Sequence, residues 1–285
     1  MTSTVSEGEA AVDGGGRALA VTPTAGHLGA TVEGLDLAAG IDDATRDRLV
    51  GMLDEHLVVH IPGQAIDDDQ QLALALRFGG PYIHPLARGS STEARCEHIV
   101  DDVDHPPYQD EWHTDVSWDE APPTYGTLRA VDLPPRGGDT IFVNTYAAFE
   151  ALSPTMQGLL EPLTARHTMG AGKAFVSKMG PEIVAKVREQ FPGAEHPVVG
   201  VHPGTGRRFL NVNRGFTESI VGLTDAESTA LLEMLFAHVT NPNFHYRHQW
   251  SLGDVVIWDE RCTQHFAVAD YMPHRREMGR CVVRV

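Results

Sequence analysis

Short segments rich in β-branched and aromatic residues recur along this chain, and glycine, proline and other turn residues bound them. Such segments are typical of strands, and they do not alternate regularly with long helices as the strands of a parallel sheet would. The pattern therefore predicts a mainly β fold, with an antiparallel core and flanking helices packed outside it. Beyond the tight turns that begin near residue 19, strands are expected at 58–61, 125–133, 139–146, 208–212, 254–259 and 279–285.

Helices are predicted where a capping residue precedes apolar residues spaced three and four apart. The capping residues are Asp42, Ser153 and Thr224. A further helix is expected over 69–78, with Leu72, Ala75 and Leu76 on its inward face. The stretch 82–110 has few apolar residues in register, so it is expected to be a long loop beside a functional site.

The length of 285 residues fits one domain, because single all-β domains often reach this size. Residues 1–17 include three consecutive glycines and few apolar residues, so we expect a disordered lead before a single domain at 18–285. No apolar run near the start is long enough for a signal peptide or a membrane span. The three cysteines are scattered and lack metal-site spacing, which indicates reduced thiols and a cytoplasmic protein.

Acidic residues outnumber basic ones by 39 to 22, which gives a formal net charge of −17. Nucleic acids and membranes are therefore not expected as partners, because both require a sustained positive surface. The arginines that concentrate near the end of the chain are Arg275, Arg276, Arg280 and Arg284. A small anion is the partner that this cluster could accept.

The strongest chemical signal is the pair His113 and Asp115, which would point to the same face of an extended strand. Among the remaining candidates for a third ligand, His265 is the best, because it follows the strand expected at 254–259. Two imidazoles and one carboxylate can hold a divalent iron and leave its opposite face open. Such a pair also arises by chance among 15 histidines, in which case His113 would be an ordinary hydrogen-bonded or surface side chain.

The C-terminal arginines bear on this choice. Arg276, Arg280 and Arg284 share one parity, so they can share one face of a strand, with Val283 and Val285 on the other. On the inner face of a barrel they would require anions, since an unpaired buried charge is strongly disfavoured. On the outer face they would be solvated, and parity alone leaves both arrangements open.

Five stretches of the chain resemble the TauD/TfdA group, the taurine dioxygenase family of Fe(II)- and 2-oxoglutarate-dependent dioxygenases. They are GATVEGLDL, EWHTDVSWDEAPP, LPPRGGDTIFVNTYAAFEALSP, HPVVGVHPGTGRRFLNVNRGF and GDVVIWDERCTQHFAVADYMPHRREMGR. In order, they span almost the whole chain from about residue 19. The resemblance implies a double-stranded β-helix, or jelly roll, with its metal site at one open end.

The resemblance also implies roles for individual residues. His113, Asp115 and His265 look like the iron ligands. Thr140 and Arg276 look like the residues that bind the distal carboxylate of 2-oxoglutarate. The implied substrate-binding residues are Arg280, which meets the acidic group, together with His84, Gln109 and Phe216.

Two positions depart from the pattern of the taurine enzymes. Ala87 stands where they carry a tyrosine, and Gln109 stands where they carry an asparagine. Losing the phenol would enlarge the pocket and remove a contact to a sulfonate. Taurine itself is therefore not the expected substrate.

The expected activity is the oxidation, with O2 and 2-oxoglutarate, of a C–H bond in a small organic acid. Where that carbon bears a sulfonate, sulfate or ether oxygen, C–S or C–O cleavage would follow. The alternative is a hydroxylase or desaturase of an amino-acid-like or secondary-metabolite substrate with the same cofactors. Two further alternatives are a zinc hydrolase that uses the same ligands and a binding protein that has lost chemistry. Relatives are commonly homo-oligomers, so we expect a dimer or a tetramer.

Overall fold

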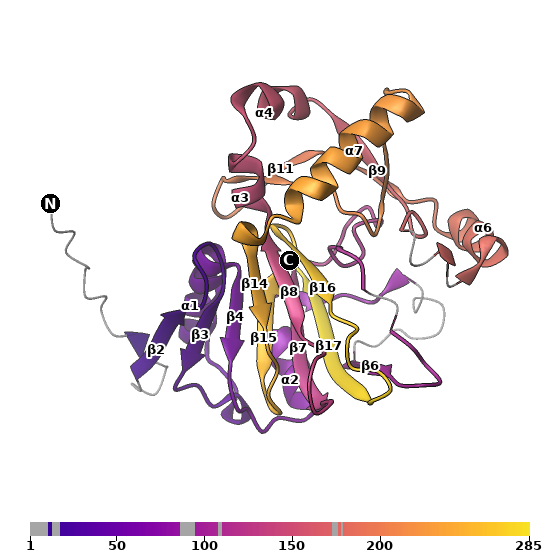
Figure 1. Cartoon of the computed structure of the whole chain (residues 1–285). Coiled ribbons are helices and arrows are strands. Elements are labelled where there is room, and N and C mark those ends of the chain that lie inside the picture. The colour runs from indigo at the N-terminus through magenta and orange to yellow at the C-terminus, as the bar shows by residue number, and fades with distance from the viewer. Residues whose placement is uncertain (1–10, 13–17, 86–94, 108–109, 173–175, 178) are drawn as a thin grey trace, which may run out of the picture.

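The computed structural model describes residues 11–12, 18–85, 95–107, 110–172, 176–177 and 179–285. Two antiparallel sheets face each other in its lower half (Figure 1). The larger sheet has the order β1 (Ala11–Val12), β2 (Ala18–Pro23), β3 (Ala30–Glu33), β4 (Val58–Ile61), β15 (Val255–Asp259), β7 (Tyr125–Asp132), β17 (Arg276–Arg284) and β5 (Gly80–Pro81), and β6 (Glu97–Asp101) also pairs with β17. The smaller has the order β14 (His245–His248), β8 (Thr140–Asn144) and β16 (Thr263–Ala267). Only the β3–β4 pair is parallel among these described strands, so the predicted mainly β, jelly-roll fold is confirmed.

Apolar side chains fill the space between the two sheets. Phe142 comes from β8, while Leu128, Trp258 and Met278 come from β7, β15 and β17. All four are buried, and Trp258 is 1% exposed. Burying side chains of this size stabilises the fold by about 1.5–3 kcal/mol each. This packing fixes the distance between the sheets, which determines how wide the pocket at their open end can be.

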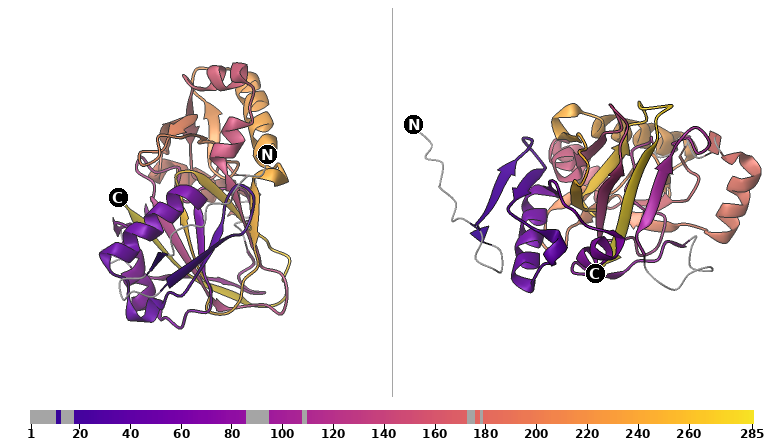
Figure 2. Two further views of the ribbon diagram at one scale, coloured as in Figure 1. Left: turned by 90° about the vertical axis from the view of Figure 1, so that its left-hand side faces the viewer. Right: turned by 90° about the horizontal axis from the view of Figure 1, so that it is seen from below.

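Two helices cover the outer face of the larger sheet, and the view from below in Figure 2 shows these layers. They are α1 (Asp43–His56) and α2 (Asp68–Ala75). Asp42 caps α1, as predicted, by accepting a hydrogen bond from the backbone N–H of Thr45. Leu49 and Leu53 of α1 are fully buried against this sheet.

The inward face predicted for the second helix is correct for Ala75, which is fully buried, and for Leu72, which packs against the core, but it is wrong for Leu76. Leu76 is 41% exposed, whereas Gln71 is fully buried. Gln71 Nε2 donates to the carbonyl oxygen of Gly279 at 2.8 Å, and its Oε1 accepts from Arg129 Nε at 3.0 Å. A buried amide is stable here because these groups satisfy it, and apolar spacing alone cannot reveal such partners.

A second layer of helices and short strands lies above the sheets (Figure 1). Its helices are α3 (Thr145–Glu150), α4 (Pro154–Leu160), α6 (Pro181–Gln190) and α7 (Asp225–Val239). The 3-10 turn η3 (Pro242–Phe244) packs against α3, whereas the 3-10 turn η1 (Leu37–Ala39) lies elsewhere. The strands of this layer are β9 (Thr164–His167), β10 (Ala194–Pro197) and β13 (Thr217–Ile220), and the pair β11 (Val199–Val201) and β12 (Arg208–Leu210). Ser153 and Thr224 cap α4 and α7 as predicted.

Several predicted boundaries move. The strand expected at 139–146 ends at Asn144, because that side chain accepts from Ala147 N–H at 3.0 Å and caps α3. The loop expected at 82–110 contains β6, which pairs with β17. Within the expected lead at 1–17, residues 11–12 pair with β2 and the rest lies outside the described residues, so the domain division stays a prediction. No helix in the described ranges is long and apolar enough to cross a membrane.

Candidate active site

His113 and His265 are joined by their backbones. His113 N–H donates to His265 O at 3.1 Å, and His265 N–H donates to His113 O at 2.8 Å. This single antiparallel bridge attaches the segment around His113 to β16, so the two imidazoles lie side by side with ring centroids 4.2 Å apart.

Two predictions about this geometry are wrong. His113 and Asp115 do not share an extended strand, because Asp115 starts a turn in which Val116 has a φ of 52°. His265 comes after the strand at 254–259 in the chain, but the end of that strand does not present it, because it lies inside a strand of its own, β16 (Thr263–Ala267). The turn nevertheless directs the Asp115 carboxylate back toward both histidines, so the three predicted ligands converge.

The converging atoms are His113 Nε2, His265 Nε2 and Asp115 Oδ1. The two nitrogens lie 3.6 and 3.9 Å from that oxygen. One ligand atom from each residue lies within 4.8 Å of the others, and all three side chains are buried. This is the donor set and spacing of a facial two-histidine, one-carboxylate metal site.

Both histidines are in the state that binds a metal. Burial lowers the pKa of His113, and burial together with the neighbouring His113 lowers the pKa of His265 to about 3. His113 Nδ1 lies 2.7 Å from the carbonyl oxygen of Glu111, which can only accept, so the lone pair is on Nε2. Within the described part of the chain, His113 Nε2 is buried without a hydrogen-bond partner. A divalent metal ion would satisfy it, so these residues fit the iron that the resemblance implies.

Asp115 is held by two further side chains. Arg280 Nη1 donates to Asp115 Oδ2 at 3.0 Å, and Glu260 Oε2 accepts from the Asp115 backbone N–H at 3.2 Å. Burial acts to raise the pKa of Asp115, but Arg280 and the two histidines outweigh it and hold the pKa at about 2. The carboxylate is therefore ionised and ready to bind a cation.

Glu260 is a site residue that the sequence did not reveal. It is fully buried, and burial together with nearby Asp115 raises its pKa well above the usual range. A glutamate that follows a strand normally faces solvent, so the sequence around Glu260 gives no sign that its side chain would support Asp115. Asp101 is a second site residue that the sequence did not reveal. It lines the pocket near Arg276, but it lies in the stretch that was expected to be a loop.

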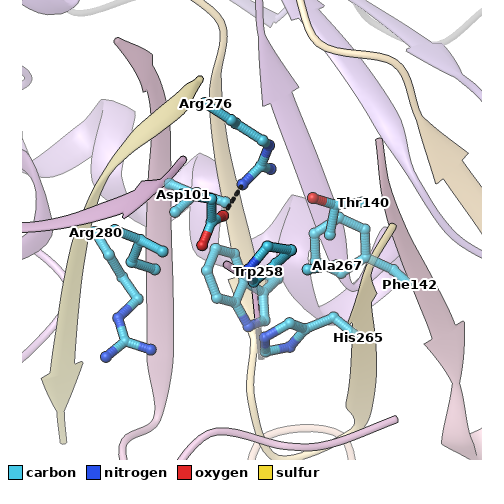
Figure 3. Close-up of a pocket in the computed structure, with 11 residues that line it drawn as sticks. Asp101, Thr140, Phe142, Trp258, His265, Ala267, Arg276 and Arg280 are labelled. Atoms are coloured by element: carbon cyan, nitrogen blue, oxygen red, sulfur yellow. Dashed lines mark ion pairs between the residues drawn. The ribbon is translucent and has the colours of Figure 1, made fainter. Parts of the chain in front are cut away.

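A pocket opens beside His265 between the two sheets (Figure 3). Arg276 and Thr140 lie at one end of it, and His265 and Arg280 lie at the other. Ala267 also lines the pocket. The two predicted co-substrate residues and Arg280, one of the predicted substrate residues, therefore share one cavity with a predicted metal ligand.

Arg276 is a buried cation with spare hydrogen-bonding capacity. It is 3% exposed, and burial lowers its pKa. Its Nε donates to Gly138 O at 3.0 Å, and its Nη1 lies 4.0 Å from Asp101 Oδ2. Its Nη2 has no hydrogen-bond partner among the described residues. At the same end of the pocket, the Thr140 hydroxyl accepts from Trp250 Nε1 at 3.0 Å and keeps its own proton to donate.

The arrangement of the C-terminal arginines that parity left open is now clear. Arg276 and Arg280 face the pocket, whereas Arg284 is exposed at the end of β17. Val283 is buried in the core on the other face of the sheet, as expected for that face, but Val285 lies beyond the strand and is 81% exposed.

The remaining predicted pocket residues are only partly described. Phe216 packs edge-on to His113, with ring centroids 6.1 Å apart. His84 lies 5.9 Å from Trp118 by ring centroids, and it is among the residues that lower the pKa of Asp115. Gln109 and Ala87 lie outside the described residues. Phe216 and His84 are therefore both near the metal ligands.

Comparison with known proteins agrees with this site. Residues 20–282 match the family model described as taurine catabolism dioxygenase TauD, TfdA family. The chain is 36% identical to an alpha-ketoglutarate-dependent sulfate ester dioxygenase of Pseudomonas putida, across 89% of this chain and 85% of that protein. It is 34% identical to an alkylsulfatase of Acinetobacter baylyi, across 90% of this chain and 81% of that protein. A solved taurine dioxygenase structure from Burkholderia xenovorans superposes with a TM-score of 0.78 at 32% identity, covering 93% of this chain and 90% of that one. The chain therefore belongs to the TauD, TfdA family, and it is a non-heme dioxygenase that depends on Fe(II), 2-oxoglutarate (alpha-ketoglutarate) and O2.

Proposed function

We propose that this enzyme binds Fe(II) through His113, Asp115 and His265 and oxidises a small organic acid of the alkyl sulfate class. The observation that carries the proposal is the convergence of three buried ligand atoms beside a pocket that contains two arginines. Bound iron and 2-oxoglutarate would supply one chemistry, the activation of O2 with conversion of 2-oxoglutarate to succinate and CO2. The protein holds the reactants and positions the C–H bond.

Arg276 and Thr140 are proposed to bind the distal carboxylate of 2-oxoglutarate. A guanidinium buried without a full set of acceptors is costly, and an entering carboxylate removes that cost with two parallel hydrogen bonds. The Thr140 hydroxyl, whose acceptor lone pair is used by Trp250, would donate to the same carboxylate. These groups lie at the end of the pocket away from His265, which leaves the metal end for the keto acid group.

Arg280 is proposed to bind the acidic group of the substrate. Its Nη1 contacts Asp115, and its Nη2 donates to Glu97 Oε2 at 2.8 Å. Glu97 is partly exposed, so a substrate sulfate can displace the Glu97 carboxylate from Arg280 and leave that carboxylate in solvent. Binding of the sulfate at Arg280 fixes the distance between the neighbouring carbon and the proposed metal ligands, and it places that carbon beside them.

An apolar cluster next to His113 is proposed to hold the alkyl chain. Val116 and Trp118 are buried there, with Phe216 and Met169 packed against them. His84 borders this cluster through Trp118. The resemblance implies that His84 and Gln109 bind the substrate, and we propose that role for both. Hydroxylation of the carbon that bears the sulfate would form an unstable product, which would release sulfate and leave an aldehyde.

The proposal is tested with a panel of alkyl sulfates, sulfonates, aryloxyalkanoates and amino acids. We expect succinate, sulfate and aldehyde to form in equal amounts from an alkyl sulfate, and only when 2-oxoglutarate and O2 are present. Succinate without a leaving group would contradict cleavage and favour a hydroxylase or desaturase. Sulfate release without 2-oxoglutarate would contradict the oxygenase and favour a zinc hydrolase.

We also propose a homo-oligomer of two or four chains, a single domain at 18–285 after a disordered lead, and a cytoplasmic location. The free cysteines Cys96, Cys262 and Cys281 support a reducing compartment. Light scattering on the purified chain tests the oligomeric state, and limited proteolysis tests the lead.

A further inference from the structure

A second set of two histidines and one aspartate lies in the same sandwich. His60 lies on β4 of the larger sheet, His248 ends β14 of the smaller sheet, and Asp254 immediately precedes β15. His60 pairs with Val256 and His248 pairs with Thr140, and these partners face the space between the sheets. The second set therefore joins the two sheets from inside.

Its geometry matches that of the first set. His60 Nε2 lies 3.2 Å from Asp254 Oδ1, and His248 Nε2 lies 3.5 Å from Asp254 Oδ2. The two ring centroids are 4.5 Å apart, against 4.2 Å for His113 and His265. One ligand atom from each residue again lies within 4.8 Å of the others.

The ring nitrogens that face Asp254 lie close to its carboxylate but make no hydrogen bond. In the described part of the chain, Nε2 of both His60 and His248 is buried without a hydrogen-bond partner. The other ring nitrogens meet hydroxyls, since His60 Nδ1 lies 3.2 Å from Thr31 Oγ1 and His248 Nδ1 lies 2.9 Å from Tyr246 Oη. A hydroxyl that accepts from Nδ1–H leaves the lone pair on Nε2, which is how metal-binding histidines are oriented.

The charge states also suit a cation. Burial lowers the pKa of His248, so its imidazole is neutral near pH 7. Burial acts to raise the pKa of Asp254, but contacts with His248 and His60 outweigh it and hold the pKa well below the usual range. The site therefore offers one carboxylate and a neutral imidazole, and it is 3% exposed at both His248 and Asp254.

The two remaining groups of possible metal ligands among the described residues have no ring nitrogen that is free to bind a metal. In the set His202, Asp259 and Cys262, the histidine Nε2 is 3.0 Å from Asp259 and its Nδ1 accepts from Thr205 N–H at 3.1 Å. Both ring nitrogens of His98 are likewise occupied, by Glu277 and Asp68. These histidines have no lone pair left for a metal.

A metal ion can reach the second set from solvent. An open hollow on the surface is lined by His60, Tyr246, Arg247, His248 and Gln249. Three protein ligands with water at the remaining positions suit zinc and its neighbours among the first-row divalent ions. We propose that His60, His248 and Asp254 form a second metal site, separate from the catalytic one, that binds a divalent transition metal such as Zn²⁺ and links the two sheets.

The test uses the full chain stripped of metal with a chelator and carrying His113→Ala and His265→Ala, which removes most of the first site. After dialysis against Zn²⁺, we expect one zinc per chain by elemental analysis and a rise in Tm. Adding Asp254→Asn, which keeps the side-chain shape, should reduce zinc to none and abolish the rise in Tm. Adding His60→Ala should do the same.

The matched control adds His245→Ala, a histidine of the same strand whose Nε2 is 2.9 Å from Val239 O. This variant should still bind one zinc. Absence of zinc from the starting variant would overturn the proposal, as would zinc that persists after Asp254→Asn. Because these variants already lack two catalytic ligands, the outcome does not depend on the proposed activity.

Discussion

At the scale of single residues, the side chains that hold the proposed metal ligands in place are as informative as the ligands themselves. Glu260 accepts from the Asp115 backbone N–H, so it fixes the turn that brings the carboxylate to the two histidines. Partners of this kind usually change metal affinity by about 10- to 100-fold when they are removed. A substitution of Glu260 therefore changes the position of the proposed ligand Asp115 while all three proposed ligands remain present.

We predict that Glu260→Ala weakens Fe(II) binding by about 10- to 100-fold. Glu260→Gln should bind Fe(II) within a few-fold of the wild type, because the amide oxygen can accept from the same N–H. Titration of Fe(II) into the metal-free protein under nitrogen measures both. Equal losses in the two variants would show that the hydrogen bond to Asp115 is not what matters.

Arg276 permits a cleaner test of co-substrate binding than Arg280 does, because Arg280 contacts the ligand Asp115 directly. We predict that Arg276→Ala raises the KM for 2-oxoglutarate by about 10- to 100-fold, the loss expected for hydrogen bonds to a charged group. Fe(II) affinity should stay unchanged. Steady-state succinate formation at varied 2-oxoglutarate gives the KM, and an unchanged value would remove Arg276 from the co-substrate site.

At the scale of elements, the sequence anticipates strands and helices whose signals are local. Capping residues such as Asp42 and Thr224 and apolar runs such as 255–259 determine their own local structure, and the helices and strand predicted from them are present. Strands β6 and β16 were missed because their residues are mostly polar, including His265 itself. They exist because strands distant in sequence offer them backbone partners, which no local pattern records.

The burial of the Gln71 amide was also missed, because its partners are distant in sequence. These partners lead to a prediction about stability. Gln71→Leu would leave Gly279 O of β17 and Arg129 Nε of β7 without their partner on α2. We expect the free energy of unfolding to fall by about 2–4 kcal/mol. Leu76→Gln at the exposed end of the same helix should change it by less than about 0.5 kcal/mol. Urea denaturation measures both, and equal effects would contradict the role of the amide.

At the scale of the whole molecule, two sheets and an upper layer bury several histidines in the neutral state. His167 is fully buried, and burial lowers its pKa from 6.5 to about 3. Between these values the unfolded chain binds one more proton than the folded chain. The free energy of unfolding should therefore fall as the pH drops from about 6.5 toward 3, and His167 should contribute about 1.4 kcal/mol per pH unit.

We predict that His167→Asn reduces this slope by about that amount, whatever it does to stability at pH 7. Urea denaturation of the metal-free protein at several pH values measures the slope. A variant with the wild-type slope would show that His167 is not protonated on unfolding in this range.

The proposed activity depends on the site where the two sheets meet the turn at Asp115. That His113, Asp115 and His265 come together could be predicted from sequence spacing and resemblance, but the geometry that brings them together could not. The turn at Val116 and the backbone bridge to β16 arise only from the folded chain.

The most direct test is visible absorption after Fe(II) and 2-oxoglutarate are added to the metal-free protein without oxygen. We predict a charge-transfer band that requires both additions, disappears in His113→Ala and needs far more 2-oxoglutarate in Arg276→Ala. A protein that binds Fe(II) and 2-oxoglutarate without this band, or a band that persists in His113→Ala, would contradict the assignment of the site.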